Sequence, residues 1–172
     1  MAETNHYATQ KKLIEKICFS GPILDLACGA GYLLKEIKDK QKYGNDISKE
    51  MLKIAKINNP LVEFTTDDVH SLVSHNRKYK ALICCNLFFY LQDSHKAVKR
   101  WISLLDSDGK LIVLEEYPFI YPKGLKYFGS LVNPVTISEI EKIMKSNGLI
   151  LEQKQKESID SAHDLYMLVF KK

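Results

Sequence analysis

The segment that most constrains the fold is an apolar run that ends in a glycine turn. Residues 23–28, ILDLAC, are almost continuously apolar, which is typical of a central strand buried on both faces of a parallel sheet. Gly29 and Gly31 follow at once, and residues 32–37 then repeat apolar side chains with helical spacing. A strand that turns on glycines into a helix is a common binding place for nucleotide-containing ligands. The segment therefore predicts a ligand site as well as an α/β fold.

Apolar runs and amphipathic segments alternate along the rest of the chain. Strands are expected at 42–46, 61–68, 79–91, 110–117, 149–157 and 163–172. Helices are expected over 8–17, behind the caps Ser48 and Ser94, and over 136–148, where Thr136 with Glu139 or Ser138 with Glu141 can form a capping box. Residues 106–109 are expected to form a turn. This alternation predicts a mostly parallel sheet with helices on both faces, and the short link between the last two strands predicts an antiparallel pair.

The helix behind Ser48 should bury one apolar face. Met51, Leu52, Ile54 and Ala55 recur with helical spacing and are expected to form it.

Length, charge and cysteine usage narrow the class. The 172 residues fit one domain, and no apolar run is long enough to span a membrane. The net charge of +4 comes from lysines that are scattered and paired with acids, so it indicates solvated helix faces and leaves a nucleic-acid partner as the less favoured option. Cys18, Cys28, Cys84 and Cys85 form no C-x-x-C pair, and residues 1–10 lack a basic start and an apolar core. We therefore expect buried reduced thiols in a cytoplasmic protein.

Acidic residues end three successive strands beside the glycine turn. Asp25 comes just before the turn, Asp46 ends the second strand, and Asp67 and Asp68 end the third. An acid at the first position suits a cationic group better than a pyrophosphate, although Asp25 could also bond only the loop amides. An acid at the second position can accept both ribose hydroxyls, and one at the third can accept from an adenine amine. Together they predict a ligand with an amine, a ribose and an adenine, and without phosphate.

These segments resemble the class I S-adenosylmethionine-dependent methyltransferase family in its small free-standing form. The resemblance rests on ILDLACGAG, YGNDISKEMLKIA and VEFTTDDVHSL, and it extends through YKALICCNLFFYLQD, LLDSDGKLIVLEE and TISEIEKIMKSNGL. It implies a Rossmann-like three-layer sandwich whose seven-stranded, mostly parallel sheet ends in an antiparallel strand pair. It also implies one domain over 1–172: a helix over 1–20 that can serve as a lid, a cofactor-binding half over 21–116, and an acceptor side over 117–172.

The resemblance also assigns cofactor contacts for S-adenosyl-L-methionine. The residues implied are Asp25, Ala27, Cys28, Gly29, Gly31, Asp46, Ile47, Asp68, Val69 and Asn86. The turn would lie along the methionine part, with Asp25 at its amino group, Asp46 at the ribose diol and Ile47 on the adenine. Asp68 and the Val69 amide would meet the adenine edge, Asp67 being the less favoured register. Cys85 or Asn86 would lie near the sulfonium, and no metal is implied.

The sequence does not identify a catalytic base. Family members often carry a His pair after the fourth strand, where this chain has Phe89 and Tyr90, and Lys80 replaces an acid common at that strand's start. Tyr90, His95, Glu116 and Tyr117 are candidates by position, with packing or surface roles as the alternatives. The chain also lacks the N-P-P-Y-like stretch used for exocyclic amines and the Pro-Cys used at cytosine carbon-5.

The aromatic segment over 117–134, YPFIYPKGLKYFGSLVNP, is where this family often builds its acceptor pocket; covering the sheet is the alternative role. Overall, the sequence predicts a methyltransferase acting on a small molecule, with nucleic acid or protein acceptors left open. Two alternatives remain: a catalytically inactive, cofactor-binding partner subunit, and a nicotinamide-dependent oxidoreductase, against which Asp25 and Leu34 argue.

Overall fold

The computed structural model describes residues 2–18, 20–39, 41–119, 126–127 and 130–172. The helices are α1 Ala2–Ile14, α2 Tyr32–Glu36, α3 Lys49–Asn58, α4 Ser94–Leu104 and α5 Ile137–Ser146, with a 3₁₀ turn, η1, at Phe88–Tyr90. The strands are β1 Ile23–Asp25, β2 Lys42–Asn45, β3 Glu63–Thr65, β4 Tyr79–Cys85, β5 Leu105–Tyr117, β6 Lys126–Tyr127, β7 Ser130–Leu131, β8 Ile150–Ser158 and β9 Asp164–Lys171.

The main sheet has seven strands in the order β3-β2-β1-β4-β5-β9-β8. Strands β1 to β5 pair in parallel, whereas β9 pairs antiparallel with both β5 and β8. Strand β1 lies between β2 and β4, so the strand order reverses there, and ligands in such sheets bind at the carboxyl ends beside that reversal. The predicted mostly parallel sheet and its antiparallel terminal pair are confirmed.

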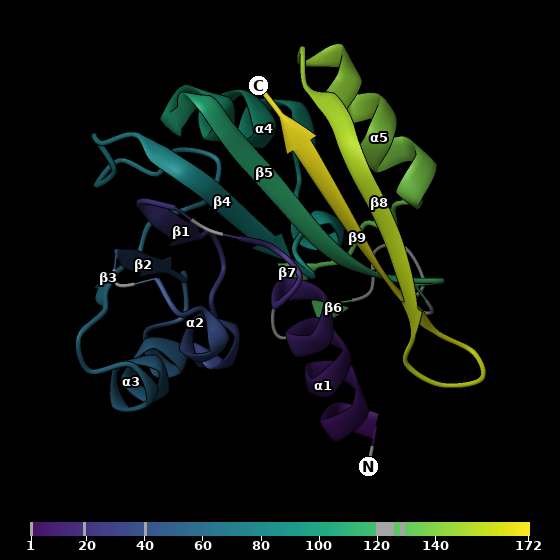
Figure 1. The fold of residues 1–172 in the computed structure, drawn as a ribbon, viewed down its shortest axis with the longest axis horizontal. Coiled ribbons are helices and arrows are strands. Elements are labelled where there is room, and N and C mark those ends of the chain that lie inside the picture. The colour runs from purple at the N-terminus through teal and green to yellow at the C-terminus, as the bar shows by residue number, and fades with distance from the viewer. Residues whose placement is uncertain (1, 19, 40, 120–125, 128–129) are drawn as a thin grey trace.

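Helices cover both faces of the sheet, which makes the predicted three layers (Figure 1). One core packs α1, α2 and α3 against Ile23 and Ile83, and the other packs α4 and α5 against Leu24 and Leu82. Neighbouring strand residues belong to opposite cores because side chains alternate across a sheet. Burial on both faces explains why the sequences of β1 and β4 are nearly continuously apolar.

Several local predictions need correction. The first helix begins earlier than residue 8 and ends at Ile14, not at residue 17. The N-cap of α4 is Asp93, whose carboxylate accepts from the Lys96 amide, and Ser94 is the first helical residue. Residues 106–109 belong to β5, where the pairing with β4 is irregular between Tyr79 and Ala81.

The buried face of α3 is narrower than the spacing of its apolar residues predicted. Leu52 and Ala55 are buried, but Met51 is 39% and Ile54 43% exposed. Ser48 does cap this helix, accepting from the Met51 amide. At α5 the box forms between Thr136 and Glu139, which decides between the two predicted alternatives.

The described helices include none that is both long and apolar enough to cross a bilayer.

Candidate functional site

A buried side chain ties together the carboxyl ends of the first three strands. The amide nitrogen of Asn45, at the end of β2, donates to the Leu26 and Asp67 carbonyls, each at 3.0 Å. Its oxygen accepts from the Asp67 amide and from the Thr65 hydroxyl, each at 2.8 Å. Asn45 has no exposed surface. It therefore fixes the positions of the neighbouring candidate residues, although sequence reasoning did not single it out.

A second set of hydrogen bonds connects that junction to His75 and Tyr79. The Thr65 hydroxyl lies 2.8 Å from His75 Nε2, and His75 Nδ1 lies 2.8 Å from the Tyr79 hydroxyl. Thr65 donates to Asn45, so its oxygen accepts from His75 Nε2–H, and His75 Nδ1 accepts from Tyr79. Burial lowers the pKa of His75 and keeps it in this neutral form.

Gly29 lies in the turn between β1 and α2 with a φ of 51°, in the left-handed region. A Cβ placed there would meet no atom within 4 Å, so the turn leaves open space against its backbone. This is the kind of surface that a ligand lying along the chain requires.

Gly31 lies where the turn packs closely on α3. Its φ is 75°, and a Cβ would lie 2.6 Å from Asn59 Nδ2 and 3.2 Å from Ala55 Cβ. Close packing of the turn on α3 thus by itself requires glycine at this position, and the ligand contact expected for Gly31 stays a prediction. Asn58 and Asn59 complete that packing by donating to the Ala30 and Gly31 carbonyls at 2.9 and 2.8 Å.

Asp25 ends β1 with 1% of its surface exposed. Its carboxyl accepts one long hydrogen bond, 3.4 Å, from the Ala27 amide. Burial raises its pKa to about 7, an effect that the Ala27 bond opposes and the Asp46 charge adds to. A buried carboxyl that is this poorly solvated suits a cationic partner. The predicted alternative, bonding to a loop amide, is also present.

Asp46 follows β2 and holds the glycine turn. One oxygen accepts from the Gly29 amide at 2.7 Å, and the other accepts from the Ser48 amide at 2.9 Å. Each carboxylate oxygen can accept a second bond, so the group can still receive hydroxyl donors. Ile47 next to it is 71% exposed, which makes it an uncovered apolar surface beside the carboxylate.

The two acids after β3 differ in their surroundings. Asp67 is buried and accepts from the Ser74 amide and hydroxyl at 2.6 and 2.9 Å. The Asp68 side chain is 56% exposed and accepts from both the His70 amide (2.8 Å) and His70 Nδ1 (2.6 Å). The His70 amide, above all, lowers the pKa of Asp68. Asp68 is thus the accessible one of the two acids, and its lowered pKa keeps it ionised.

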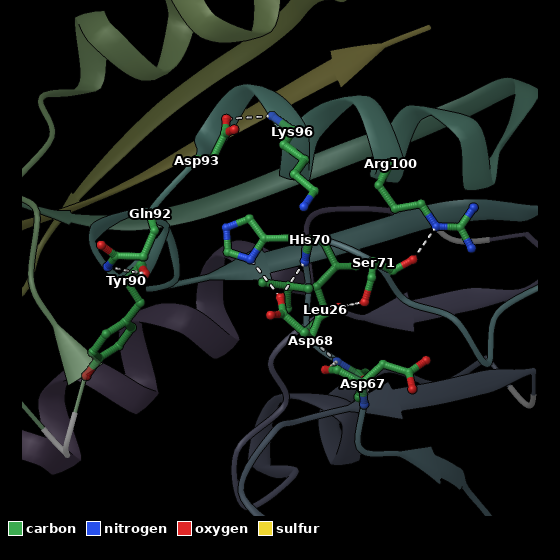
Figure 2. Close-up of polar contacts among 12 residues, drawn as sticks. Leu26, Asp67, Asp68, His70, Ser71, Tyr90, Gln92, Asp93, Lys96 and Arg100 are labelled. Atoms are coloured by element: carbon green, nitrogen blue, oxygen red, sulfur yellow. Dashed lines mark hydrogen bonds and ion pairs between the residues drawn. The ribbon is translucent and has the colours of Figure 1, made fainter.

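Helix α4 borders this carboxylate. Figure 2 shows Lys96 extending from α4 toward the Asp68–His70 pair, and its charge also lowers the pKa of Asp68. The Val69 carbonyl accepts from the Trp101 indole at 2.8 Å, which anchors the loop to the same helix. His70 Nε2 is buried without a hydrogen-bond partner among the described residues.

A polar cluster lies at the carboxyl ends of β4 and β5. Asn86 has a φ of 47°, unusual for a residue other than glycine, and its side-chain oxygen accepts from the Glu116 amide at 3.2 Å. His6 of α1 approaches it, with Nε2 3.1 Å from Asn86 Nδ2 and 3.3 Å from Glu116 Oε2. Gln10, one turn along α1, donates to the Cys85 sulfur at 3.1 Å.

His6 was missed by sequence reasoning. The available signal was its spacing: His6 and Gln10 continue the helical face that Leu13 and Ile14 bury. Polar side chains on a buried face need polar partners, and here the ends of β4 and β5 supply them.

The structure places the four catalytic candidates predicted from the sequence in different surroundings. Glu116 contacts His6, whereas His95 contacts Asn147 at the end of α5, at 3.1 Å. The Tyr117 ring packs edge-on against Tyr166, with centroids 6.4 Å apart. Tyr90 lies beside Phe89, with centroids 4.4 Å apart.

Only part of the predicted aromatic segment can be assessed. Phe119, which follows β5, stacks on Phe89 of η1 with centroids 4.2 Å apart. Tyr121 and Pro122 lie outside the described residues, as does most of 117–128.

The two cysteines at the end of β4 are not nucleophilic thiolates. Burial raises the thiol pKa of Cys84 and of Cys85 well above the usual value, so both stay protonated. Cys28 is buried, but Cys18 is exposed, which corrects the expectation of four buried thiols.

Within the described part of the chain, no three His, Cys, Asp or Glu side chains gather as metal ligands. Two surface hollows, beside Cys18 and Lys80, lie toward the amino ends of the strands, away from the candidate site.

Comparisons with known proteins agree with this geometry. Residues 23–109 match a family model described as "Methyltransferase domain". No curated protein matches the sequence.

Solved structures share the fold at low sequence identity. Magnesium protoporphyrin IX methyltransferase from Synechocystis PCC 6803, crystallised with S-adenosylhomocysteine, is 19% identical with a TM-score of 0.74, over 98% of this chain and 84% of that one. A methyltransferase from Mesorhizobium loti is 12% identical with a TM-score of 0.76, over 100% and 98%. The cyclase SpnF is 14% identical with a TM-score of 0.76, over 96% and 81%.

Proposed function

We propose that this chain, which belongs to the class I S-adenosylmethionine-dependent methyltransferase family, transfers a methyl group from S-adenosylmethionine to a small-molecule acceptor. The observation that carries the proposal is the pairing of Asp25 with the open turn at Gly29. Asp25 is a buried carboxyl that forms no ion pair among the described residues, and the space against Gly29 can receive an extended ligand. An amino acid with a cationic amine fits both features.

The residues present fit the remainder of the cofactor. Asp46 has acceptor capacity left for the ribose hydroxyls, and Ile47 offers an uncovered apolar surface to the adenine. Asp68 is ionised and exposed, as an acceptor for the adenine amine should be, with Val69 beside it. Ala27, Cys28, Gly29 and Gly31 would follow the methionine part, and Asn86 would lie near the sulfonium.

The chain's own task is positioning. The cofactor supplies an activated methyl group on a sulfonium, so the protein needs mainly to hold the acceptor in line and to exclude water. Within the proposed division of the domain, residues 21–116 would hold the cofactor. Helix α1 would act as the lid over the ends of β4 and β5, which His6 and Gln10 already touch.

The acceptor side is proposed to be aromatic. Phe89 and Phe119 stack next to the end of β4, and Phe119 stays partly exposed. The Synechocystis neighbour is named for a porphyrin substrate, which favours a small planar acceptor here as well. The role of Tyr121 in that pocket stays a prediction.

Calorimetry and a labelled screen test the proposal. The protein should bind S-adenosylmethionine and S-adenosylhomocysteine, and it should not bind NADH. A screen of metabolite pools with methyl-labelled cofactor should then reveal the acceptor. Binding of NADH alone would reverse the assignment.

A second candidate is a cofactor-binding subunit without methyl transfer. The cyclase SpnF carries this fold under a different activity name, so the fold does not fix the chemistry. Tight binding of S-adenosylhomocysteine with no labelled product from any pool, with or without a cell extract as a source of partner, would favour this candidate.

A further inference from the structure

Three elements distant in sequence bring a histidine, an amide and a carboxylate together at the ends of β4 and β5. His6 comes from α1, Asn86 follows β4, and Glu116 lies near the end of β5. The His6 side chain is 22% and that of Glu116 33% exposed, so a small molecule can reach both. The cluster includes Asn86, which the proposed function places near the reacting methyl group.

The orientation of the Asn86 amide is fixed by its neighbours. Its oxygen accepts from the Glu116 backbone N–H at 3.2 Å, so its nitrogen faces His6. A left-handed backbone at Asn86 turns the chain sharply after β4 and aims this side chain at α1.

His6 Nε2 therefore faces a donor and an acceptor at once. Without a proton it can accept from Asn86 Nδ2 at 3.1 Å; with a proton it can donate to Glu116 Oε2 at 3.3 Å. Gln10 lies 3.4 Å from Nδ1 on the other side of the ring. Surroundings that accommodate both protonation states of an imidazole are what a general base requires.

We propose that His6 is the general base for methyl transfer, and that the acceptor is an amine or a hydroxyl compound whose nucleophilic atom carries a proton. The inference rests on the proposed function and specifies its acceptor. The acceptor's nitrogen or oxygen forms a bond to the methyl carbon while the carbon–sulfur electron pair returns to sulfur. The acceptor's proton passes to His6 Nε2. Glu116 then stabilises the imidazolium, and solvent takes the proton before the next turnover.

The titratable groups around His6 are consistent with this role. Burial lowers the pKa of His6, against the charge of Glu116, so the ring starts without an extra proton near neutral pH. Cys85 of β4, which accepts from the Gln10 side chain, has a raised thiol pKa and stays neutral. His163, in the β8–β9 loop, is affected by the charge of Glu116, although its pKa is raised chiefly by its hydrogen bond to Asp160.

The first arm of the test needs no acceptor. NMR titration follows the His6 ring protons, assigned by their loss in His6→Gln. Glu116→Gln should lower the pKa of His6, because the imidazolium loses its partner. Asn86→Gly should raise that pKa, because the neutral ring loses its donor, and glycine suits the left-handed backbone. Glu157→Gln is the matched control, since Glu157 pairs with Lys12 and Lys16 of α1 and should leave the pKa unchanged.

The second arm uses the acceptor that the labelled screen identifies. At saturating cofactor, His6→Gln should lower kcat by about 10²–10⁴-fold and remove the acid limb of the pH–rate profile. Its affinity for S-adenosylhomocysteine should match wild type, which separates this inference from the proposed cofactor site.

Two results would overturn the inference. One is a His6 pKa that ignores both Glu116→Gln and Asn86→Gly in folded protein. The other is methylation confined to acceptors without a transferable proton, such as thioethers or tertiary amines. A protein that binds no S-adenosylhomocysteine would instead refute the proposed function.

Discussion

The Gly29 backbone N–H donates a 2.7 Å hydrogen bond to the Asp46 carboxylate, across 17 residues of sequence. This bond joins the glycine turn after β1 to the end of β2, and the Ser48 amide holds the other carboxylate oxygen at 2.9 Å. Asp46 therefore shapes the turn as well as offering acceptors to a ribose. Its two roles can be separated by experiment.

Replacing Asp46 with alanine should weaken binding of S-adenosylhomocysteine by roughly 1.5–3 kcal/mol, the range for hydrogen bonds to a charged group. A 2′,3′-dideoxyribose analogue should lose less, because it lacks the hydroxyls that Asp46 would accept from. Isothermal calorimetry with both ligands measures the difference. Equal losses for the two ligands would mean that Asp46 acts only by holding the turn.

Gly29→Val should abolish cofactor binding in a folded protein. The branched side chain would fill the open space at Gly29 and would be strained at a φ of 51°. Gly148→Val is a matched control: Gly148 also has a positive φ with nothing within 4 Å of an added Cβ, but it follows α5. Both variants should lose about 1–3 kcal/mol of unfolding free energy. Normal affinity in folded Gly29→Val would show that the turn has no ligand against it.

The raised pKa of Asp25 predicts two pH dependences. An unfolded aspartate titrates near a pKa of about 3.9, and the folded one titrates at about 7. Between these values the folded state binds the extra proton, so its contribution to stability falls as pH rises from about 4 to 7. Asp25→Asn should flatten that part of the stability profile. Burial also raises the pKa of Glu115, to about 8, so Glu115 likewise makes stability fall as pH rises. It is present in both wild type and Asp25→Asn.

Cofactor affinity should follow the opposite trend. A cationic amine favours the ionised form of Asp25, so affinity for S-adenosylhomocysteine should rise as pH increases through about 7. Calorimetry at pH 6 in buffers of different ionisation enthalpy should detect proton release on binding. Release of the same number of protons by Asp25→Asn would assign the effect to another group.

Asn45→Ala should destabilise the domain and weaken cofactor binding together. The substitution leaves the Leu26 carbonyl and both Asp67 backbone groups without their buried partner, at a cost of about 1–3 kcal/mol for each group that water cannot reach. Asn58→Ala is the control, since it removes one contact, to the Ala30 carbonyl, from a partly exposed residue. Urea denaturation compares the two, and a smaller loss for Asn45→Ala than for the control would refute this account.

The layered sheet and most of its elements could be predicted from the sequence because the signals are local. Burial on both faces makes a strand such as Ile23–Asp25 continuously apolar, and Thr136 with Glu139 marks the start of α5 within four residues. The cofactor candidates follow for the same reason: Asp25, Asp46 and Asp68 each lie at or within three residues of the end of a recognisable strand. Parallel strands place such residues at one edge of the sheet.

What the sequence could not give depends on contacts between distant segments. Ser94 and Asp93 are both adequate N-caps, and only the path of the chain into α4 selected Asp93. The α3 periodicity included Met51 and Ile54, but only the side that carries Leu52 and Ala55 is buried. The spacing of apolar residues along a helix does not show how much of that helix its neighbours will cover.

The sequence by itself determined the fold class and the acidic residues beside the glycine turn, because strand periodicity and turn chemistry are written in adjacent residues. Only the tertiary structure decided that Gly31 packs on α3 and that Asn45 joins three strand ends. It also decided that His6 meets Asn86 and Glu116. These contacts join residues 19 to 110 positions apart, and their energies arise only when the folded chain removes those polar groups from water.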